Sequence, residues 1–177
     1  WGEAERQGQA AVGMQYSPAH IFASFPPEKQ AAILAELDPE VLALLRFHWP
    51  FWARPNQLMP GGDWAYWLVL AGRGFGKTRI GAETVRQWVK TDNMVNLIGA
   101  TVDDIRDIMI EGESGILAIC PNDERPNYKK SERKLEWKNG AVSLLFSATE
   151  PERLRGKQHK KLWCDEMASW PYAESWD

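Results

Sequence analysis

The chain has 177 residues, of which 44% are hydrophobic, and a formal net charge of −3. This length suits one folded domain or slightly more, and the lack of an overall basic field argues against a protein that coats nucleic acid. Cys120 and Cys164 lack metal-ligand spacing, so we expect reduced, buried thiols and no disulfide. The longest apolar run is too short to cross a bilayer, so we expect no membrane partner.

The N-terminal part of the sequence predicts short helices and loops. Residues 1–24 show no sustained hydrophobic period, and we expect a loosely ordered segment there. Two short amphipathic helices are expected next, separated at Asp38-Pro39, where Asp38 can cap the second helix. Residues 49–63 are rich in proline and glycine and predict a loop. We therefore expect a helical preamble within a domain that spans residues 25–177.

A glycine-rich loop is the most informative feature of the chain. Residues 64–71 predict a strand and residues 78–90 a helix, and between them lies the run Gly72-Arg73-Gly74-Phe75-Gly76-Lys77-Thr78-Arg79. Glycines allow consecutive backbone N–H groups to point at an anion, the lysine can reach the β and γ phosphates of a nucleotide, and the threonine can supply a hydroxyl to Mg²⁺. The usual G-x-x-x-x-G-K-[ST] pattern has glycine where this chain has Ala71. We expect this whole run to bind ATP with Mg²⁺.

Gln57 lies upstream of this loop and is a candidate for recognising the adenine ring. Its amide offers both a hydrogen-bond donor and an acceptor. A solvated loop residue is the alternative, and the spacing does not distinguish the two.

A pair of adjacent acidic residues further along the chain supports the prediction made from the glycine-rich loop. An apolar strand expected at residues 160–164 ends in the adjacent carboxylates Asp165 and Glu166. This looks like a Walker B strand, in which the first acid completes the Mg²⁺ shell and the second polarises the attacking water. Alone, a glycine-rich loop can be a structural turn and an acidic pair a solvated strand end. Together they predict nucleotide binding.

The remaining elements alternate between strand and helix. We expect a strand at 94–100, helices at 102–110 and 114–119, two strands at 134–137 and 141–147 joined by an Asn139-Gly140 turn, and a helical turn at 150–154. This order predicts an α/β fold with a mostly parallel sheet and an antiparallel pair at one edge. The expected class is a P-loop NTPase of the RecA-like, ASCE kind, a three-layer sandwich. Because the chain starts without Met and ends soon after Glu166, we expect it to be C-terminally truncated.

Several segments together resemble one protein family. They are Asp63 to Glu83, Phe146-Ser147-Ala148, Leu154-Arg155-Gly156 and Trp163 to Trp170, and they are similar to the N-terminal ATPase half of the large terminase subunit. That family contains the DNA-packaging motors of tailed phages, prophages and gene transfer agents. The resemblance implies an ATPase that drives double-stranded DNA into a procapsid from the cytoplasm of a bacterial host. It also implies a homo-oligomeric ring that works with the portal protein and the small terminase subunit.

The resemblance also implies roles for individual residues. It implies that Lys77 and Thr78 hold the phosphates and Mg²⁺ and that Asp165 completes the Mg²⁺ shell. Glu166 would be the catalytic base. Arg155 matches the arginine that reaches into a neighbouring subunit's site, and Arg73 is a second candidate that would act from within its own loop. The alternative for Arg155 is an ordinary surface ion pair. We see no acidic cluster here for the family's nuclease domain.

One departure from the family pattern follows Arg155. Family members often carry Pro-Gln after Leu-Arg-Gly, whereas residues 157–161 of this chain are basic and include His159. We expect His159 to be solvated, because a lone histidine without partners at ligand spacing makes a poor metal site.

Two other functions stay open. The first is a superfamily 2 helicase or another RecA-like translocase, although Asp165-Glu166-Met167-Ala168 lacks the endings common in those helicases. The second is a non-catalytic prophage remnant that binds nucleotide without turning it over. An incomplete sheet with exposed edges would favour the remnant.

Overall fold

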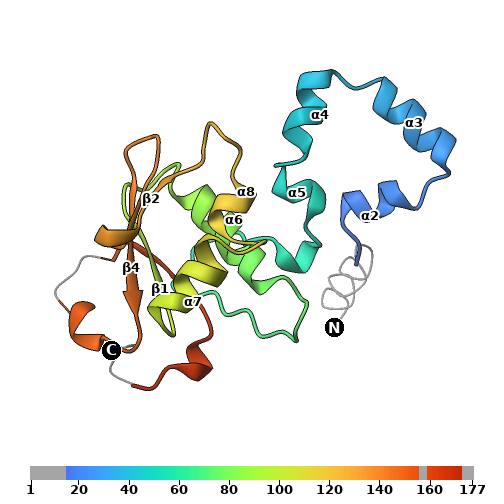
Figure 1. Cartoon of the computed structure of the whole chain (residues 1–177). Helices are drawn as coiled ribbons and strands as arrows, with labels where there is room; N and C mark the ends of the chain where they lie inside the picture. The colour runs from blue at the N-terminus through green and yellow to red at the C-terminus, as the bar shows by residue number, and fades with distance from the viewer. Residues whose placement is uncertain (1–14, 156–158, 173–177) are drawn as a thin grey trace, which may run out of the picture. The chain divides into compact units, whose positions relative to one another are not determined.

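The computed structural model describes residues 15–155 and 159–172, and Figure 1 shows the chain. The chain divides into two compact units between Trp67 and Leu68, whereas the hydrophobic pattern predicts a division after residue 24. In the described ranges, no helix is long and apolar enough to cross a membrane.

The first unit consists of short helices, most of which begin at or next to a proline. They are α2 (Pro18–Ala23), α3 (Pro27–Ala35), α4 (Pro39–Leu45), α5 (Trp49–Trp52) and the 3-10 turn η1 (Pro55–Gln57). Proline suits a first helical turn because its missing N–H would be unused there. Asp38 caps α4 as predicted, and its Oδ1 accepts the N–H of Glu40 at 2.7 Å.

Two of these helices correct the sequence-based expectations. Helix α2 forms within the segment expected to be loosely ordered, and the Oγ of Ser17 accepts the N–H of His20 at its start. Helix α5 forms within the segment expected to be a loop. Residues 1–14 of the first of these segments lie outside the described residues.

The second unit contains a five-stranded sheet in the order β2-β3-β4-β1-β5. Its strands are β1 (Val95–Gly99), β2 (Asn127–Lys129), β3 (Lys134–Glu136), β4 (Val142–Ser147) and β5 (Lys161–Cys164). Strand β1 pairs in parallel with β4 and β5, whereas β3 pairs antiparallel with β2 and β4. The α/β class is thus confirmed, but the sheet is mixed and not mostly parallel. Every residue of β1 is buried, as its apolar run and two parallel neighbours require.

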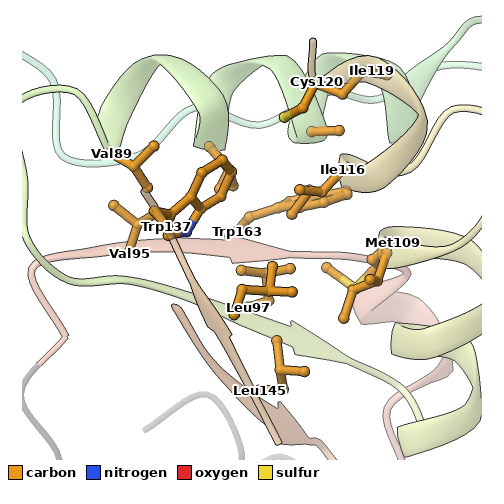
Figure 2. Close-up of a cluster of buried hydrophobic side chains, with 14 of the residues drawn as sticks. Val89, Val95, Leu97, Met109, Ile116, Ile119, Cys120, Trp137, Leu145 and Trp163 are labelled. Atoms are coloured by element: carbon orange, nitrogen blue, oxygen red, sulfur yellow. The ribbon is translucent and has the colours of Figure 1, made fainter. Parts of the chain in front are cut away.

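Helices cover one face of this sheet (Figure 1). The helical elements of the second unit are α6 (Lys77–Trp88), α7 (Val102–Asp104), the π-helical η2 (Ile105–Ile110), α8 (Ile116–Ile119) and the 3-10 turns η3 (Lys130–Glu132), η4 (Pro151–Arg153) and η5 (Met167–Ser169). Side chains from α6, η2 and α8 form the main core with inward-facing strand residues. Figure 2 shows this core, including Leu97, Met109, Ile116, Trp137 and Trp163.

The opposite face of the sheet carries a smaller apolar cluster. Ile98, Phe146 and Ala148 are buried there, with Leu154 and Trp170 packed against them. Leu154 directly follows η4 and Trp170 directly follows η5. Within the described residues this face is therefore covered by short turns, and the expected three-layer sandwich is not confirmed.

The strand predicted at residues 64–71 is wrong. No residue of this range is in a strand, and Leu68 and Leu70 are 69% and 84% exposed. A strand forms only when its backbone N–H and C=O groups find partners along a neighbouring strand. The apolar pattern of residues 64–71 does not indicate whether a neighbouring strand is available to pair with.

The predicted hairpin forms with a longer loop than expected. The N–H of Gly140 donates to Trp137 O, and the N–H of Trp137 donates to Ala141 O, both at 2.9 Å. Gly140 has φ +89°, which suits a turn followed by a left-handed glycine better than a two-residue turn. Asn139 Nδ2 donates to Val89 O at 2.7 Å, so the loop is tied to the end of α6.

A glycine in α6 sets how closely this helix approaches the sheet. Gly81 is buried in α6, and a Cβ added there would overlap the indole of Trp163 on β5. The side chain of Trp163 is itself buried between α6 and the sheet (Figure 2). Only glycine permits this contact, which holds the start of α6 near the end of β5.

We expect Gly81→Ala to lower the free energy of unfolding by about 1–3 kcal/mol, the usual cost of overpacking a core. This loss should appear even though alanine favours a helix over glycine by up to about 1 kcal/mol. Urea denaturation measures the change, with Gly72→Ala as the control because an added Cβ there has nothing within 4 Å. Unchanged stability of Gly81→Ala would contradict the close packing.

Candidate functional site

The glycine-rich loop curls directly into the N-terminus of α6. Gly74 and Gly76 have φ values of +79° and +92°, a backbone region that favours glycine. Gly76 is the N-cap residue of α6, and an added Cβ at Gly72 or Gly74 would meet no atom within 4 Å. The first N–H groups of a helix lack intrahelical partners, so this open loop and helix start form a setting suited to an anion.

Lys77 lies folded back over the loop. Its Nζ donates to Ala71 O at 3.0 Å and to Gly72 O at 3.4 Å. The ammonium of Lys77 thus links the end of the loop to Ala71 and Gly72 at its start.

The acidic pair follows β5 in a tightly held turn. The N–H of Asp165 donates to Ile98 O at 2.9 Å, and Trp170 Nε1 donates to Asp165 O at 3.0 Å. Glu166 adopts the left-handed region, with φ +48° and ψ +45°. Its carbonyl accepts both the N–H of Ser169 at 2.9 Å and the Oγ of Ser169 at 2.7 Å. A non-glycine residue in this conformation persists only when its surroundings hold it there.

Burial raises the pKa of Asp165, and the neighbouring charge of Glu166 raises it further. The ammonium of Lys77 acts in the opposite direction and lowers the pKa of Asp165. A partly buried carboxylate with acidic neighbours is a site where added positive charge would be favourable.

A small pocket of about 90 Å³ opens at this end of the sheet. It is lined by Gly99, Ala100, Asp104, Ile108, Met109, Asp165, Glu166 and Ser169. Asp104 was missed by the sequence analysis, and its charge also contributes to the raised pKa of Asp165. Its Oδ2 accepts the N–H of Thr101 at 3.1 Å and the Thr101 hydroxyl at 2.6 Å. The Thr-x-x-Asp spacing directly after β1 is the signal that could have located it.

A buried carboxylate organises the residues behind the loop. Glu83 of α6 is almost fully buried and pairs with Arg79 at 2.7 Å and with Arg86 at 3.3 Å. Arg86 continues to Glu124 at 2.5 Å. Burial raises the pKa of Glu83, and the two arginines oppose that rise. The guanidinium of Arg79, one residue after Thr78, is therefore held by a fixed acid.

The structure places the other predicted site residues as follows. Arg73 is exposed. Arg155 is also exposed and pairs with Glu152 at 3.1 Å, across side chains that are 67% and 77% exposed. Gln57 belongs to the first unit, where it is buried and its Oε1 accepts the N–H of Arg54 at 2.8 Å. The roles of Arg73, Arg155 and Gln57 stay predictions.

His159 is not solvated, and the sequence-based expectation is wrong. Its ring is partly buried, contacts Phe146 edge-on with the ring centroids 5.3 Å apart, and lies 3.0 Å from Asn96 Nδ2 through Nδ1. The signal that could have found it is a polar Asn96 inside an otherwise apolar strand, because a buried amide requires polar partners.

Cys120 and Cys164 are both free thiols, as predicted, and burial raises the pKa of each to about 12. Among the described residues, no group of three or more His, Cys, Asp or Glu side chains could hold a metal ion.

A glycine-rich loop at a helix start, beside the acidic end of a parallel strand, defines an α/β domain suited to phosphate binding. The family model described as terminase large subunit, T4likevirus-type, N-terminal, matches residues 68–176. The chain belongs to this family, and the matched range begins where the second unit begins. Membership indicates a role in phage DNA packaging, with DNA and the packaging machinery as partners. Searches of the curated proteins and of the solved structures found no match.

The raised pKa of Asp165 has a consequence for stability. A carboxyl with a higher pKa in the folded than in the unfolded state destabilises the fold once it ionises, so stability falls as the pH rises through that range. We expect Asp165→Asn to raise the Tm at pH 7 by about 2–5 °C when divalent cations are chelated. The difference from the wild type should shrink below pH 4, where the carboxyl is protonated in both states.

Differential scanning calorimetry at several pH values measures this change. Asp123→Asn is the control, because Asp123 is exposed and its replacement should leave the Tm unchanged. A lower Tm of Asp165→Asn at pH 7 would show that the carboxylate stabilises the fold and would overturn the interpretation.

Proposed function

We propose that this chain is the ATP-hydrolysing part of a large terminase subunit, which powers the movement of double-stranded DNA into a procapsid. One observation carries the proposal: the helix that begins at Lys77 packs through Gly81 against Trp163 of the strand directly before Asp165. The ammonium of Lys77 also acts to lower the pKa of Asp165. Family membership supports the same reading. A structural turn and a solvated strand end would have no reason to lie together.

The loop supplies the phosphate contacts in this proposal. Backbone N–H groups from Gly72 to Arg79 surround the phosphates, and Phe75 lies within this run. The Nζ of Lys77 leaves the carbonyls of Ala71 and Gly72 for the β and γ phosphates. The exchange is favourable because a phosphate oxygen carries more charge than a carbonyl, and charge-assisted hydrogen bonds are the stronger ones.

The residues of the site also fit Mg²⁺. A threonine hydroxyl and a carboxylate are the oxygen donors that this cation prefers, and it usually keeps several waters as well as substrate phosphates. Thr78 and Asp165 are the residues that would hold it. Bound there, it would neutralise charge that develops on the phosphates. This positive charge would favour the ionised form of Asp165, whose pKa is raised by burial and by the charge of Glu166.

Glu166 is the proposed catalytic base. Its side chain is exposed and lines the pocket, and the two hydrogen bonds from Ser169 fix its backbone. A carboxylate at this position can accept a hydrogen bond from the attacking water and orient it toward the γ phosphate.

Arg155 is the proposed arginine finger, acting on the ATP site of a neighbouring copy. Its pair with Glu152 is between exposed side chains, and such surface pairs contribute little, so the guanidinium can leave it readily. An arginine finger is worth about 10³–10⁵ in rate. Arg73, exposed within the loop itself, is the alternative that would act in its own subunit.

The remaining partners follow from this function. The motor would be a homo-oligomeric ring docked on the portal protein of the procapsid. It would work with the small terminase subunit in the cytoplasm of the bacterial host.

We expect Lys77→Ala to abolish ATP turnover, because it removes the ammonium group that lies against the loop backbone and would contact the phosphates. Arg155→Ala should lower turnover at least 100-fold while leaving ATP binding within about threefold. A mixture of these two inactive variants should recover turnover, because Lys77→Ala subunits supply Arg155 to intact sites. Phosphate release at increasing protein concentration measures this recovery.

Arg153→Ala is the matched control, since Arg153 lies two residues upstream and is similarly exposed, pairing with Glu150 at 3.4 Å. It should retain full turnover. If the mixture gives only the sum of its parts, or if Lys77-dependent turnover is independent of protein concentration, Arg155 does not act on a neighbour. Loss of turnover in Arg73→Ala without recovery in the mixture would assign the finger to the loop.

A further inference from the structure

His159 is hydrogen bonded on both sides of its ring. Its Nδ1 lies 3.0 Å from Nδ2 of Asn96, a fully buried residue of β1. Its Nε2 lies 3.3 Å from the carbonyl oxygen of Leu154. The ring thus connects the centre of the sheet to the residue directly before Arg155.

The donors and acceptors of this chain of bonds can be assigned. The backbone N–H of Leu144 donates to Asn96 Oδ1 at 3.0 Å, so the amide nitrogen of Asn96 faces His159. An amide NH₂ group only donates, so Nδ1 of His159 must accept. The ring proton is therefore on Nε2, where it donates to Leu154 O. The neutral ring satisfies both contacts.

Packing holds the ring in this place. His159 contacts Phe146 edge-on, at an interplanar angle of 71°. Leu154 packs into the same cluster on this face of the sheet. The carbonyl that His159 holds belongs to the planar peptide unit that also contains the N–H of Arg155. Its orientation therefore sets the direction in which the chain leaves Leu154.

We propose that His159 is a positioning residue for Arg155. By holding the Leu154–Arg155 peptide against the sheet, it fixes the point from which the guanidinium extends toward a neighbouring copy. This inference rests on the proposed role of Arg155, but the hydrogen bond itself can be tested without ATP. His159 is bound through Nε2 to the Arg155 peptide and through Nδ1 to Asn96, so the two contacts can be separated by substitution.

Two isosteric substitutions separate them. His159→Gln places an amide where Nε2 lies and keeps the bond to Leu154 O. His159→Asn reaches only the position of Nδ1, so it keeps the contact with Asn96 and loses the bond to Leu154. If His159 is a positioning residue, the two variants should differ at Arg155 while having similar Tm values.

An arginine-specific protease measures the local effect. Cleavage after Arg155 should be about tenfold faster in His159→Asn than in the wild type, because cleavage follows the population of the opened segment and one hydrogen bond of ordinary strength is lost. In His159→Gln it should stay within about twofold. Cleavage after Arg46, an exposed residue of the first unit, is the reference. Equal cleavage after Arg155 in both variants, or faster cleavage in His159→Gln, would overturn the proposal.

ATP turnover separates this inference from the proposed function. If both hold, His159→Asn should lose turnover at least tenfold and His159→Gln should retain it. If Arg155→Ala leaves turnover intact while the two His159 variants still differ in cleavage, the finger role is wrong and the hydrogen bond is real. If Arg155→Ala abolishes turnover but the His159 variants behave alike, the finger stands and the positioning role is overturned.

Discussion

The close contact between α6 and β5 is the constraint on which the rest of the site depends. Gly81 has no side chain, so the helix lies directly against the indole of Trp163. The loop stands at the start of this helix and Asp165 directly follows this strand. A wider separation between α6 and β5 would move the glycine-rich loop away from Asp165. Each feature would then be only a turn or the end of a strand. The geometry of the site is thus set by packing some distance from its chemistry.

Electrostatics at the site oppose stability. Asp165, Glu166 and Asp104 place three carboxylates around one small pocket, and the pKa of Asp165 is raised by burial and by these neighbours. Natural sites retain such unfavourable charge where a ligand uses it. In α6, by contrast, the negative charge of the buried Glu83 is balanced by ion pairs with Arg79 and Arg86. The buried carboxylate of Glu83 is therefore paired with arginines, whereas Asp165 has acidic neighbours.

The sequence predicted the elements that are defined by their own residues. The strands at β1, β4 and β5, the helix α6 and the Asp38 cap follow from local patterns, and all formed. Features that depend on distant partners were not predictable in this way. Residues 64–71 have a strand pattern but form no strand among the described residues. Asp104 reaches the pocket because β1 and β5 are neighbours, and His159 is partly buried where it contacts Asn96. The roles of the site residues rest on chemistry that the fold makes possible and that experiment must test.

The ammonium of Lys77 is already hydrogen bonded to two carbonyl groups of the loop, those of Ala71 and Gly72. Any phosphate that recruits this ammonium must first displace Ala71 O and Gly72 O, so its observed affinity is a difference between two sets of contacts. The same bonds join the end of the loop to its start, together with the N–H of Phe75, which donates to Gly72 O at 3.4 Å. Under the proposed function, Lys77 would exchange its hydrogen bonds to the loop carbonyls for contacts with a phosphate. Phosphate binding would then change how the loop backbone is held.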